Sequence, residues 1–196
     1  MMPTLRQGER LLIPKWETWL HTLGIGNFKR GDVVVFKPPT NAPEAWHSFY
    51  GMWKYRPYFV KRIVALAGDT IRLEAGTVWV NGHISDYNQV HDYWIKQNCL
   101  DQSSSLANNA RNTFDYTPIS KSFIVPNGEY FVMGDNRSEG GSEDSRMFGS
   151  IPLEQIAGRV AAIWFPWSRH VNAAYNCANA QVTLSGPTEN NLRILP

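Results

Sequence analysis

The residue of this sequence best suited to chemistry is Lys61, which lies in the apolar, β-branched segment Tyr58 to Asp69. The segment ends in Ala-Gly-Asp and predicts one strand that runs into a tight turn. Alternation along a strand places Lys61 on one face with Phe59, Ile63 and Ala65. A lysine in water has a pKa near ~10.4, and burial without a counter-charge lowers that pKa. If Lys61 is buried in this way, its amine can act as a base.

The same pattern also allows a structural interpretation of Lys61. A lysine on an edge strand discourages aggregation, and its stem can lie along apolar surface while the amine stays in water. Arg62 lies on the opposite face of the predicted strand with Val60 and Val64, and it is just as isolated among apolar neighbours. The strand alone does not decide which of the two cations is buried.

A dense polar loop is the second candidate for chemistry. It follows the predicted strand Glu129 to Met133 and runs from Gly134 to Arg146 as Gly-Asp-Asn-Arg-Ser-Glu-Gly-Gly-Ser-Glu-Asp-Ser-Arg. Polar loops held between strands are common sites of binding and catalysis. A serine hydroxyl becomes a nucleophile when a neutral amine lies within hydrogen-bond reach, so serine and lysine can act together without a histidine.

The length, composition and charge of the chain limit the classes of fold and partner that it can have. With 196 residues, of which 43% are hydrophobic and 18% charged, the chain can bury a core in one large or two small domains. The net charge of +2 is spread along the sequence, so charge indicates neither a nucleic-acid partner nor an anionic membrane surface. The sequence has no apolar run of about 18 residues, and its first residues do not have the pattern of a signal peptide.

The histidines and cysteines give no sign of a metal site. The five histidines are scattered and no Cys-x-x-Cys pair exists, so we expect neither a metal nor a cofactor. Cys99 and Cys177 lie far apart in polar segments. They form either one disulfide in an oxidising compartment or two free thiols.

The elements that must position these residues are mostly strands. Short β-branched or aromatic runs end at Gly, Pro or Asn-Gly turns, which is typical of antiparallel strands and hairpins. A short helix is predicted over Trp16 to Leu23. Besides Tyr58 to Asp69, the predicted strands are Arg10 to Ile13, Val33 to Phe36, Thr70 to Glu74, Thr77 to Val80, Phe123 to Val125, Glu129 to Met133 and Arg159 to Phe165. The predicted fold class is mostly β, with antiparallel sheets and with polar and aromatic loop insertions.

We expect one catalytic domain over residues 1–196, with a core of residues 1–84 and 123–165. Residues 85–122 are polar without a sustained period and are predicted as a long excursion, and the polar tail 172–196 is predicted to be peripheral. The insertion 40–57 carries large apolar side chains that either pack as a satellite core under a loop or lie at a bilayer interface. These side chains are Trp46, Phe49, Tyr50, Met52, Trp53 and Tyr55.

Four segments, in this order, resemble the type I signal peptidases, the membrane-bound Ser/Lys endopeptidases that remove signal peptides from exported proteins. Met1-Met2-Pro3-Thr4-Leu5 is similar to the segment right after that family's nucleophilic serine, in the pattern Ser-Met-x-Pro-Thr-Leu. Arg30 to Phe36 resembles the family's Gly-Asp strand, and Tyr58 to Asp69 resembles its lysine strand. Gly134 to Arg146 resembles its Gly-Asp-Asn-Arg...Ser-x-Asp-Ser-Arg box. The resemblance implies a signal-peptidase-like fold, similar also to that of the Ser-Lys self-cleaving repressors.

The resemblance implies roles for individual residues. Lys61 is the expected general base, and Ser142 is expected to hydrogen-bond to its amine and orient it. Asp144 and Arg146 are expected to form a structural ion pair near the site. The residues expected to shape the loop are Gly134, Asp135, Asn136, Arg137 and Ser145. Asp135, Asn136 and Arg137 are expected to do so through bonds from side chain to backbone. The residues expected to line the apolar substrate pocket are Met1, Leu5, Phe59 and Val60.

The resemblance also implies a substrate and a location. Shallow pockets fit the family's preference for small side chains, commonly Ala, at the first and third positions before the cut, with the substrate extended along a strand edge. The expected partners are preproteins that carry signal peptides, together with a membrane that is reached through an anchor, and no nucleic acid. The expected location is the bacterial cytoplasmic membrane, with the catalytic domain on its extracytoplasmic face.

The largest departure from the family's pattern is at the start of the sequence. The nucleophilic serine is expected immediately before Met1, and neither it, nor the upstream serine of the oxyanion hole, nor the membrane anchor is present in the sequence as given. The chain as given is therefore expected to be inactive. The loop between Arg137 and Ser142 is also two residues longer than the family's usual spacing.

Two alternatives to an active signal peptidase follow from the sequence. One is a catalytically inactive relative that binds exported segments without cutting them, which the missing serine suggests. The other is a Ser/Lys self-cleaving repressor-type peptidase, which shares the dyad. The sequence favours it less, because no DNA-binding domain precedes the matching segments.

Overall fold

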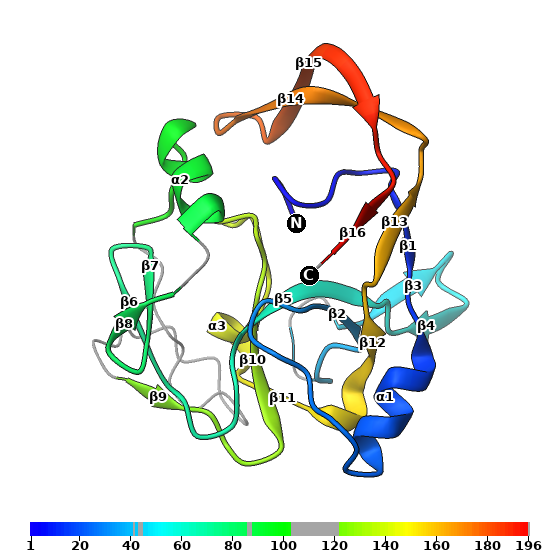
Figure 1. Cartoon of the computed structure of the whole chain (residues 1–196), viewed down its shortest axis with the longest axis vertical. Helices are drawn as coiled ribbons and strands as arrows, with labels where there is room; N and C mark the ends of the chain where they lie inside the picture. The colour runs from blue at the N-terminus through cyan, green and yellow to red at the C-terminus, as the bar shows by residue number, and fades with distance from the viewer. Residues whose placement is uncertain (41, 43–44, 86–87, 103–121, 196) are drawn as a thin grey trace.

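The computed structural model describes residues 1–40, 42, 45–85, 88–102 and 122–195, and this part of the chain is built mostly from antiparallel strands (Figure 1). The predicted fold class is confirmed. The helices are α1 Lys15–Thr22, α2 Asn88–Lys96, α3 Ser145–Phe148 and the 3-10 turn η1 Leu153–Gln155. The strands are β1 Arg10–Leu12, β2 Val33–Phe36, β3 His47–Phe49, β4 Trp53–Tyr55, β5 Phe59–Ala65, β6 Thr70–Glu74, β7 Thr77–Val80, β8 His83–Ile84, β9 Phe123–Ile124, β10 Glu129–Met133, β11 Ile151–Pro152, β12 Ile156–Arg159, β13 Ala162–Phe165, β14 Ser168–Asn176, β15 Gln181–Asn190 and β16 Arg193–Ile194.

A five-stranded sheet carries the lysine strand β5 at its centre, in the order β11-β10-β5-β2-β12. Lys61 lies opposite Val34 of β2, and Ile63 lies opposite Val132 of β10. All four residues of β2 are buried, as expected for a continuous apolar run. Among the described residues, β5 has partners on both sides from Arg62 to Ala65, whereas Lys61 is paired with β2 alone, so strand pairing does not exclude an edge position for Lys61.

Two smaller sheets flank this central sheet (Figure 1). One has the order β8-β7-β6-β9, and the predicted Asn81-Gly82 turn joins its strands β7 and β8. Its apolar side chains pack against Val64 and Ala65 at the end of β5. The other has the order β1-β13-β16 and lies near the N-terminal segment. Both sheets bury one side against the core, so β5 is supported from several directions.

The single strand predicted over Arg159 to Phe165 is wrong, because the chain forms two strands there. β12 pairs with β2 in the central sheet, whereas β13 pairs with β1 in the three-stranded sheet. At the crossing, the Val160 N–H donates to the Val33 carbonyl at 2.7 Å and the Ala161 N–H donates to the Leu12 carbonyl at 2.9 Å. A continuous apolar run does not reveal where a chain changes its partner strand.

Helix α2 lies within the segment that was predicted as a polar excursion, so that prediction is wrong for residues 88–96. Val90 and Trp94 are one helical turn apart and buried, and they pack with Met2 and Cys99. Two buried side chains in a short helix give a weak periodic signal, which the surrounding Asn, Asp and Gln residues concealed. The remainder of the predicted excursion, residues 103–121, lies outside the described residues.

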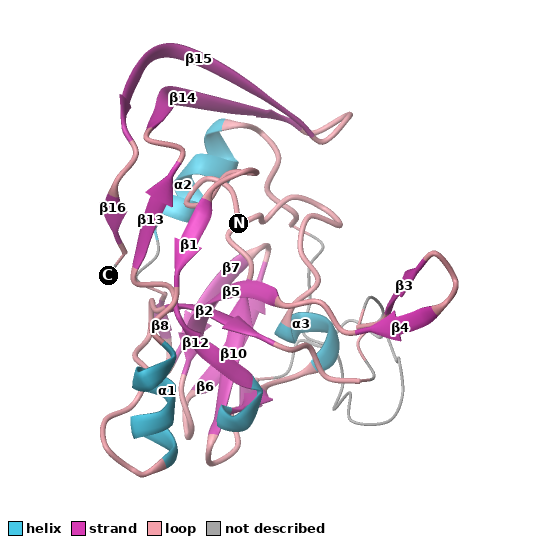
Figure 2. Ribbon diagram, turned by 90° about the vertical axis from the view of Figure 1, so that its right-hand side faces the viewer, coloured by secondary structure: helices cyan, strands magenta, loops and turns pink. Residues whose placement is uncertain are grey.

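The aromatic insertion forms the hairpin β3–β4, which projects from the rest of the molecule (Figure 2). Its large side chains are exposed, with Tyr50 at 86% and Met52 at 67%. Phe49 and Trp53 stack on each other with ring centroids 4.8 Å apart. The interpretation of these side chains as a satellite core is therefore wrong.

The residues after β13 form the long hairpin β14–β15 and the strand β16, where the sequence predicted only a peripheral tail. A disulfide joins Cys99, just after α2, to Cys177 at the end of β14. This settles the state of the two cysteines, which the sequence left open. In the described part of the chain, every helix is too short or too polar to cross a membrane.

Candidate active site

Lys61 and Ser142 meet at the centre of the site. Lys61 Nζ donates a hydrogen bond of 2.8 Å to Ser142 Oγ. Nζ also lies 5.5 Å from the centroid of the Phe59 ring, as expected for side chains two residues apart on one face of a strand. Lys61 comes from the rigid centre of a sheet, whereas Ser142 comes from the polar loop after β10. The loop therefore folds back over β5 to complete the pair.

The amine of Lys61 is in surroundings that disfavour its charged form. Burial is the main cause that lowers the pKa of Lys61 below the ordinary value for lysine. The carboxylate of Asp144 opposes this change and Arg146 adds to it. The amine is consequently neutral more often than lysine in water, and a neutral amine within hydrogen-bond reach can accept a proton.

Gly134 gives Ser142 the space to reach Lys61. A Cβ atom at residue 134 would lie 2.6 Å from Ser142 Cβ and 3.5 Å from Lys61 Nζ. The first distance is shorter than a non-bonded carbon contact allows, so a larger residue would displace Ser142. This close approach is a physical reason for glycine at the start of the loop.

Asp144 and Arg146 form a buried ion pair beneath the loop. Arg146 donates from Nε to Asp144 Oδ1 at 2.8 Å and from Nη2 to Oδ2 at 2.9 Å. The Gly134 N–H donates to Asp144 Oδ2 at 2.9 Å, and the Arg146 N–H donates to Oδ1 at 3.2 Å, which caps α3. Burial favours a higher pKa for Asp144, but the charge and hydrogen bonds of Arg146 outweigh burial and lower the pKa to about 2. The ionised carboxylate thus ties together both ends of the loop that carries Ser142.

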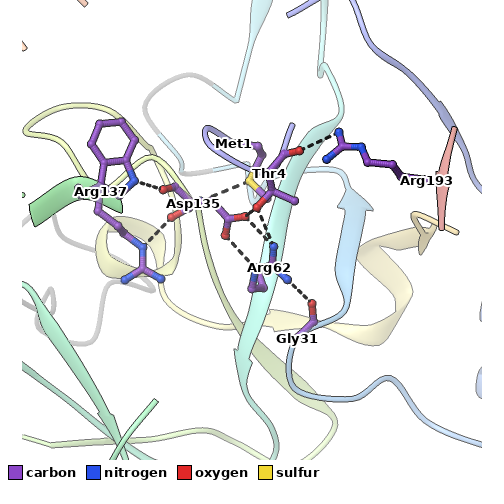
Figure 3. Close-up of polar contacts among 9 residues, drawn as sticks. Met1, Thr4, Gly31, Arg62, Asp135, Arg137 and Arg193 are labelled. Atoms are coloured by element: carbon purple, nitrogen blue, oxygen red, sulfur yellow. Dashed lines mark hydrogen bonds and ion pairs between the residues drawn. The ribbon is translucent and has the colours of Figure 1, made fainter. Parts of the chain in front are cut away.

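Arg62, on the other face of β5 from Lys61, is also buried and pairs with Asp135 (Figure 3). Its Nε and Nη2 atoms donate to the two Asp135 oxygens at 2.9 Å and 2.7 Å, and Nη1 donates to the Gly31 carbonyl at 2.8 Å. The Thr4 hydroxyl donates to Asp135 Oδ2 and accepts from Arg62 Nη2 at 3.1 Å. This network fastens the N-terminal segment to β5 and to the polar loop.

Two of the predicted loop-shaping residues bind main-chain groups as expected. Asn136 Oδ1 accepts from the N–H of Ser138 at 3.1 Å, and Arg137 Nε donates to the Gly134 carbonyl at 2.8 Å. Burial, assisted by the charge of Arg146, lowers the pKa of Arg137 to about 10. These bonds hold the first turn of the loop.

Ser145 also binds main chain, whereas Asp135 does not. Ser145 Oγ accepts from the Val132 N–H at 2.9 Å and so links α3 to β10. The Asp135 carboxylate is bonded instead to the side chains of Arg62 and Thr4. The expectation of a bond from the Asp135 side chain to backbone is therefore wrong, because an arginine from the neighbouring strand reaches its carboxylate.

The residues predicted to line a substrate pocket border two adjoining cavities. Met1, Leu5 and Val60 line a groove of about 940 Å³. Phe59 and Val60 line a second cavity of about 370 Å³, and its full lining is Tyr58, Phe59, Val60, Lys61, Gly140, Gly141, Ser142 and Glu143. Val60 is in both linings, so the two cavities lie next to each other, and the second one is also lined by Lys61 and Ser142.

Sequence reasoning missed parts of the network around Asp135. Arg62 was identified only as one of two isolated cations, and its partner lies 73 residues away in the sequence. Thr4 belongs to the segment Met1 to Leu5, but the sequence did not indicate that its hydroxyl bonds to Arg62 and Asp135. Trp94 Nε1 donates to the Asp135 carbonyl. The signal for Arg62 was present, since a second cation in a buried strand needs a carboxylate, but nothing in the sequence indicated Trp94.

Comparison of the chain with known protein families distinguishes between the classes of protein that the sequence left open. Residues 1–167 match the model of the family described as signal peptidase, peptidase S26. The chain belongs to this family. The match includes Lys61, the polar loop and the strands that carry them, and it favours the peptidase over the self-cleaving repressor.

Individual signal peptidases are similar over most of the chain. Signal peptidase I of Bacillus licheniformis is 31% identical over 169 residues, which cover 86% of this chain and 73% of the relative. Signal peptidase I P of Bacillus subtilis subsp. natto is 34% identical over 170 residues, which cover 86% and 74%. Probable signal peptidase I-2 of Synechocystis is 32% identical, with coverage of 86% and 61%. A crystal structure of a signal peptidase I from Enterococcus faecalis V583 is 23% identical with a TM-score of 0.42, over 69% of this chain and 97% of that one.

Proposed function

We propose that the protein is a serine endopeptidase that cleaves signal peptides from exported proteins, with Lys61 as its general base. The observation that carries the proposal is the bond of 2.8 Å between Lys61 Nζ and Ser142 Oγ in a buried setting. The bond orients the amine, and burial lowers its pKa. Membership of the signal peptidase family supports this class of reaction.

The nucleophile in this proposal is a serine directly before Met1. Met1 lies beside the loop after β10, where its Sδ accepts from the Asp135 N–H at 3.5 Å, and it lines the groove together with Val60 of β5. In this proposal a serine joined to the Met1 nitrogen by a peptide bond reaches the Lys61 amine. The bonds of Thr4 to Arg62 and Asp135 keep the segment in this position.

The proposed mechanism uses the amine twice. Neutral Lys61 accepts the proton of the serine hydroxyl while the serine oxygen attacks the scissile carbonyl carbon. The C–N bond breaks, and the lysine ammonium returns the proton to the leaving amine. Lys61 then takes a proton from water, and the resulting hydroxide attacks the acyl carbon. The ester C–O bond breaks, and the lysine ammonium gives its proton to the leaving serine oxygen, which restores the serine hydroxyl. Ser142 orients the amine, and Asp144 with Arg146 holds the loop.

The substrate lies extended across Lys61, with small side chains at the first and third positions before the cut. The support for this is the groove lined by the apolar side chains of Met1, Leu5 and Val60, next to the smaller and more polar cavity of Phe59, Lys61 and Ser142. An extended chain in this space binds mainly through main-chain hydrogen bonds along a strand edge.

The same proposal places the catalytic domain at the outer face of the bacterial cytoplasmic membrane, where preproteins emerge. The disulfide between Cys99 and Cys177 supports an oxidising compartment. The exposed Trp and Tyr side chains of the β3–β4 hairpin support contact with a bilayer interface, where such side chains are favoured.

The test is cleavage of a peptide with Ala-x-Ala before the scissile bond by a protein that carries the proposed serine before Met1. We expect Lys61→Ala to lower kcat/KM by about a thousandfold or more, because the base is lost. Lys29→Ala, which removes an exposed lysine, is the matched control. Full activity of the Lys61→Ala protein would contradict the mechanism. Binding without cleavage by the unsubstituted protein would favour the inactive relative.

A further inference from the structure

A groove of about 940 Å³ lies beside the site, under a hairpin that the proposed mechanism does not use. Its lower wall is the N-terminal segment with Val60 of β5. Its upper wall is the tip of the β14–β15 hairpin, residues Ala180 to Leu184. Figure 1 and Figure 2 both show the hairpin passing over the N-terminal end of the chain. The hairpin follows residue 167, where the family match ends.

The groove lies next to the cavity lined by Lys61 and Ser142, and Val60 is in the lining of both. Cavities of about 300–1,000 Å³ enclose most of a drug-sized molecule, so the groove has room for several residues of a peptide. The two small side chains before the cut fill only part of it. A polypeptide bound across Lys61 therefore continues under the hairpin.

The strand β15 offers such a polypeptide both main-chain groups and apolar side chains. In the described part of the chain, β15 pairs only with β14, so its other edge is open. The N–H and C=O groups of an open edge can pair with an added strand. Val182 and Leu184 lie on one face of β15, line the groove and are 40% and 48% exposed.

The hairpin is held in position by a disulfide and by hydrogen bonds to the rest of the chain. The disulfide joins Cys177 to Cys99 after α2. Arg6 Nη1 donates to the His170 carbonyl at 2.6 Å, and Tyr93 Oη donates to the Ala173 carbonyl at 3.0 Å. A two-stranded hairpin is only marginally stable alone in water, so these ties keep β15 above the groove and reduce the ordering cost on binding.

We propose that β15 binds the apolar segment of a signal peptide as an added strand, beyond the two small side chains before the cut. In this arrangement Val182 and Leu184 contact alternate apolar side chains of the substrate. The inference rests on the proposed function, because that function names the polypeptide that crosses Lys61. Signal peptides carry apolar runs of about 7–15 residues before the small residues at the cleavage site, which suits an apolar groove next to shallow pockets.

The test is the affinity of two labelled peptides, measured by fluorescence anisotropy. The short peptide has Ala-x-Ala and the residues next to the cut, and the long peptide adds about ten apolar residues before them. We expect the double substitution Val182→Asp and Leu184→Asp to raise the Kd of the long peptide about tenfold or more, because charge replaces two apolar contacts. Val171→Asp is the matched control, since Val171 is 43% exposed on β14 and is not among the groove-lining residues.

A milder pair of substitutions controls for the possibility that the two aspartates disturb the fold of the β14–β15 hairpin. Val182→Ala with Leu184→Ala should weaken binding of the long peptide in the same direction, with an unchanged circular dichroism spectrum and an intact disulfide. An unchanged Kd for the long peptide in both double variants would overturn the inference. An equal loss in the Val171→Asp control would overturn it as well.

Cleavage of the same long peptide separates this inference from the proposed function. If the unsubstituted protein, with the proposed serine present, binds the long peptide through β15 and does not cleave it, the proposed function fails and the binding site stands. If it cleaves the peptide and the β15 variants change neither Kd nor KM, only the inference fails. If the long peptide is neither bound nor cleaved, both fail.

Discussion

At the scale of the residue, the proposed mechanism depends on an amine that is uncharged at the moment of attack. Lys61 has no carboxylate as its direct hydrogen-bond partner among the described residues; its partner is the hydroxyl of Ser142. Asp144 lies close enough to raise the pKa of Lys61, but its two oxygens are bonded to Arg146 and to the Gly134 N–H. The positive charge of Arg146 therefore offsets part of the effect of Asp144 on the pKa of Lys61.

The pH dependence of activity follows from the lowered pKa of Lys61. We expect kcat/KM to rise with pH as the amine loses its proton, with a midpoint below the ordinary value for lysine of about 10.4. The measurement is a pH profile of peptide cleavage by the protein with the proposed serine. A midpoint at or above the ordinary value would contradict the role of Lys61 as a buried base.

The pH dependence of the free energy of unfolding provides an independent check of the lowered pKa of Lys61. Because the pKa of Lys61 is lower in the folded protein, the unfolded chain binds more protons between the folded and unfolded pKa values. The contribution of Lys61 to the free energy of unfolding therefore increases with pH in this window, and it is lost as the pH falls through the folded pKa. Lys61→Met should remove this contribution, which urea unfolding at several pH values can measure.

Most of the residues at the site were predicted from the sequence, because a cation in an apolar strand and a dense polar loop both stand out from their surroundings. Lys61 stands out as a cation in an apolar strand, and the resemblance assigns Ser142 to it despite the longer loop. The role of Gly134 was predicted only in general terms, because its need for space appears when Ser142 folds back against it. Thr4 was not singled out, since its partners come from β5 and from the loop after β10.

At the scale of the element, the pair Arg62 and Asp135 determines how the N-terminal segment meets β5. Arg62 is 6% exposed and Asp135 is fully buried, and the pair bonds to Thr4 and to the Gly31 carbonyl. Breaking a buried pair from one side is costly, because the other charge remains buried without its partner. The pair therefore positions the N-terminal segment, which lines the groove of about 940 Å³.

A double-mutant cycle tests this positioning role. We expect Arg62→Met to lower the free energy of unfolding by about 3–5 kcal/mol, and Arg62→Met with Asp135→Leu to lower it by less. Arg30→Met, which breaks an ion pair between Arg30 and Asp69 with the arginine side chain 41% exposed, should cost about 1 kcal/mol or less. Equal losses for Arg62→Met and Arg30→Met in urea titrations would contradict the argument.

The elements that the sequence predicted are those with a strong local pattern. β2, β5 and β10 are runs of β-branched and aromatic residues bounded by turn residues, so local propensity and burial agree. Helix α2 was missed because only Val90 and Trp94 are buried in it, against residues from distant segments. The hairpin β14–β15 was missed because the residues of β15 are exposed and its apolar alternation is limited to Val182 and Leu184, before Gly186 and Pro187.

At the scale of the whole molecule, two hairpins extend from the central sheets in different directions (Figure 2). β14–β15 is tied to the body by a disulfide and lies over the groove, whereas β3–β4 projects freely and carries exposed aromatic side chains. Lys54 lies in β4 and Arg56 follows its last residue. Aromatic side chains beside cations suit the interface of a bilayer with anionic lipids.

Vesicle binding tests this role of the β3–β4 hairpin. We expect the chain to bind vesicles of phosphatidylethanolamine and phosphatidylglycerol, and Tyr50→Ser with Trp53→Ser to weaken binding about tenfold, which is about 1.4 kcal/mol. The matched control is Trp19→Ser, which removes a tryptophan that is 62% exposed on α1, away from the hairpin. Sedimentation of protein with vesicles measures the partition. If the control weakens binding as much as the hairpin variant, exposed aromatics in general attach the protein and the hairpin has no special place at the membrane. If only the hairpin variant loses binding, the bilayer lies on the side of β3–β4, and this fixes the orientation in which substrates reach Lys61.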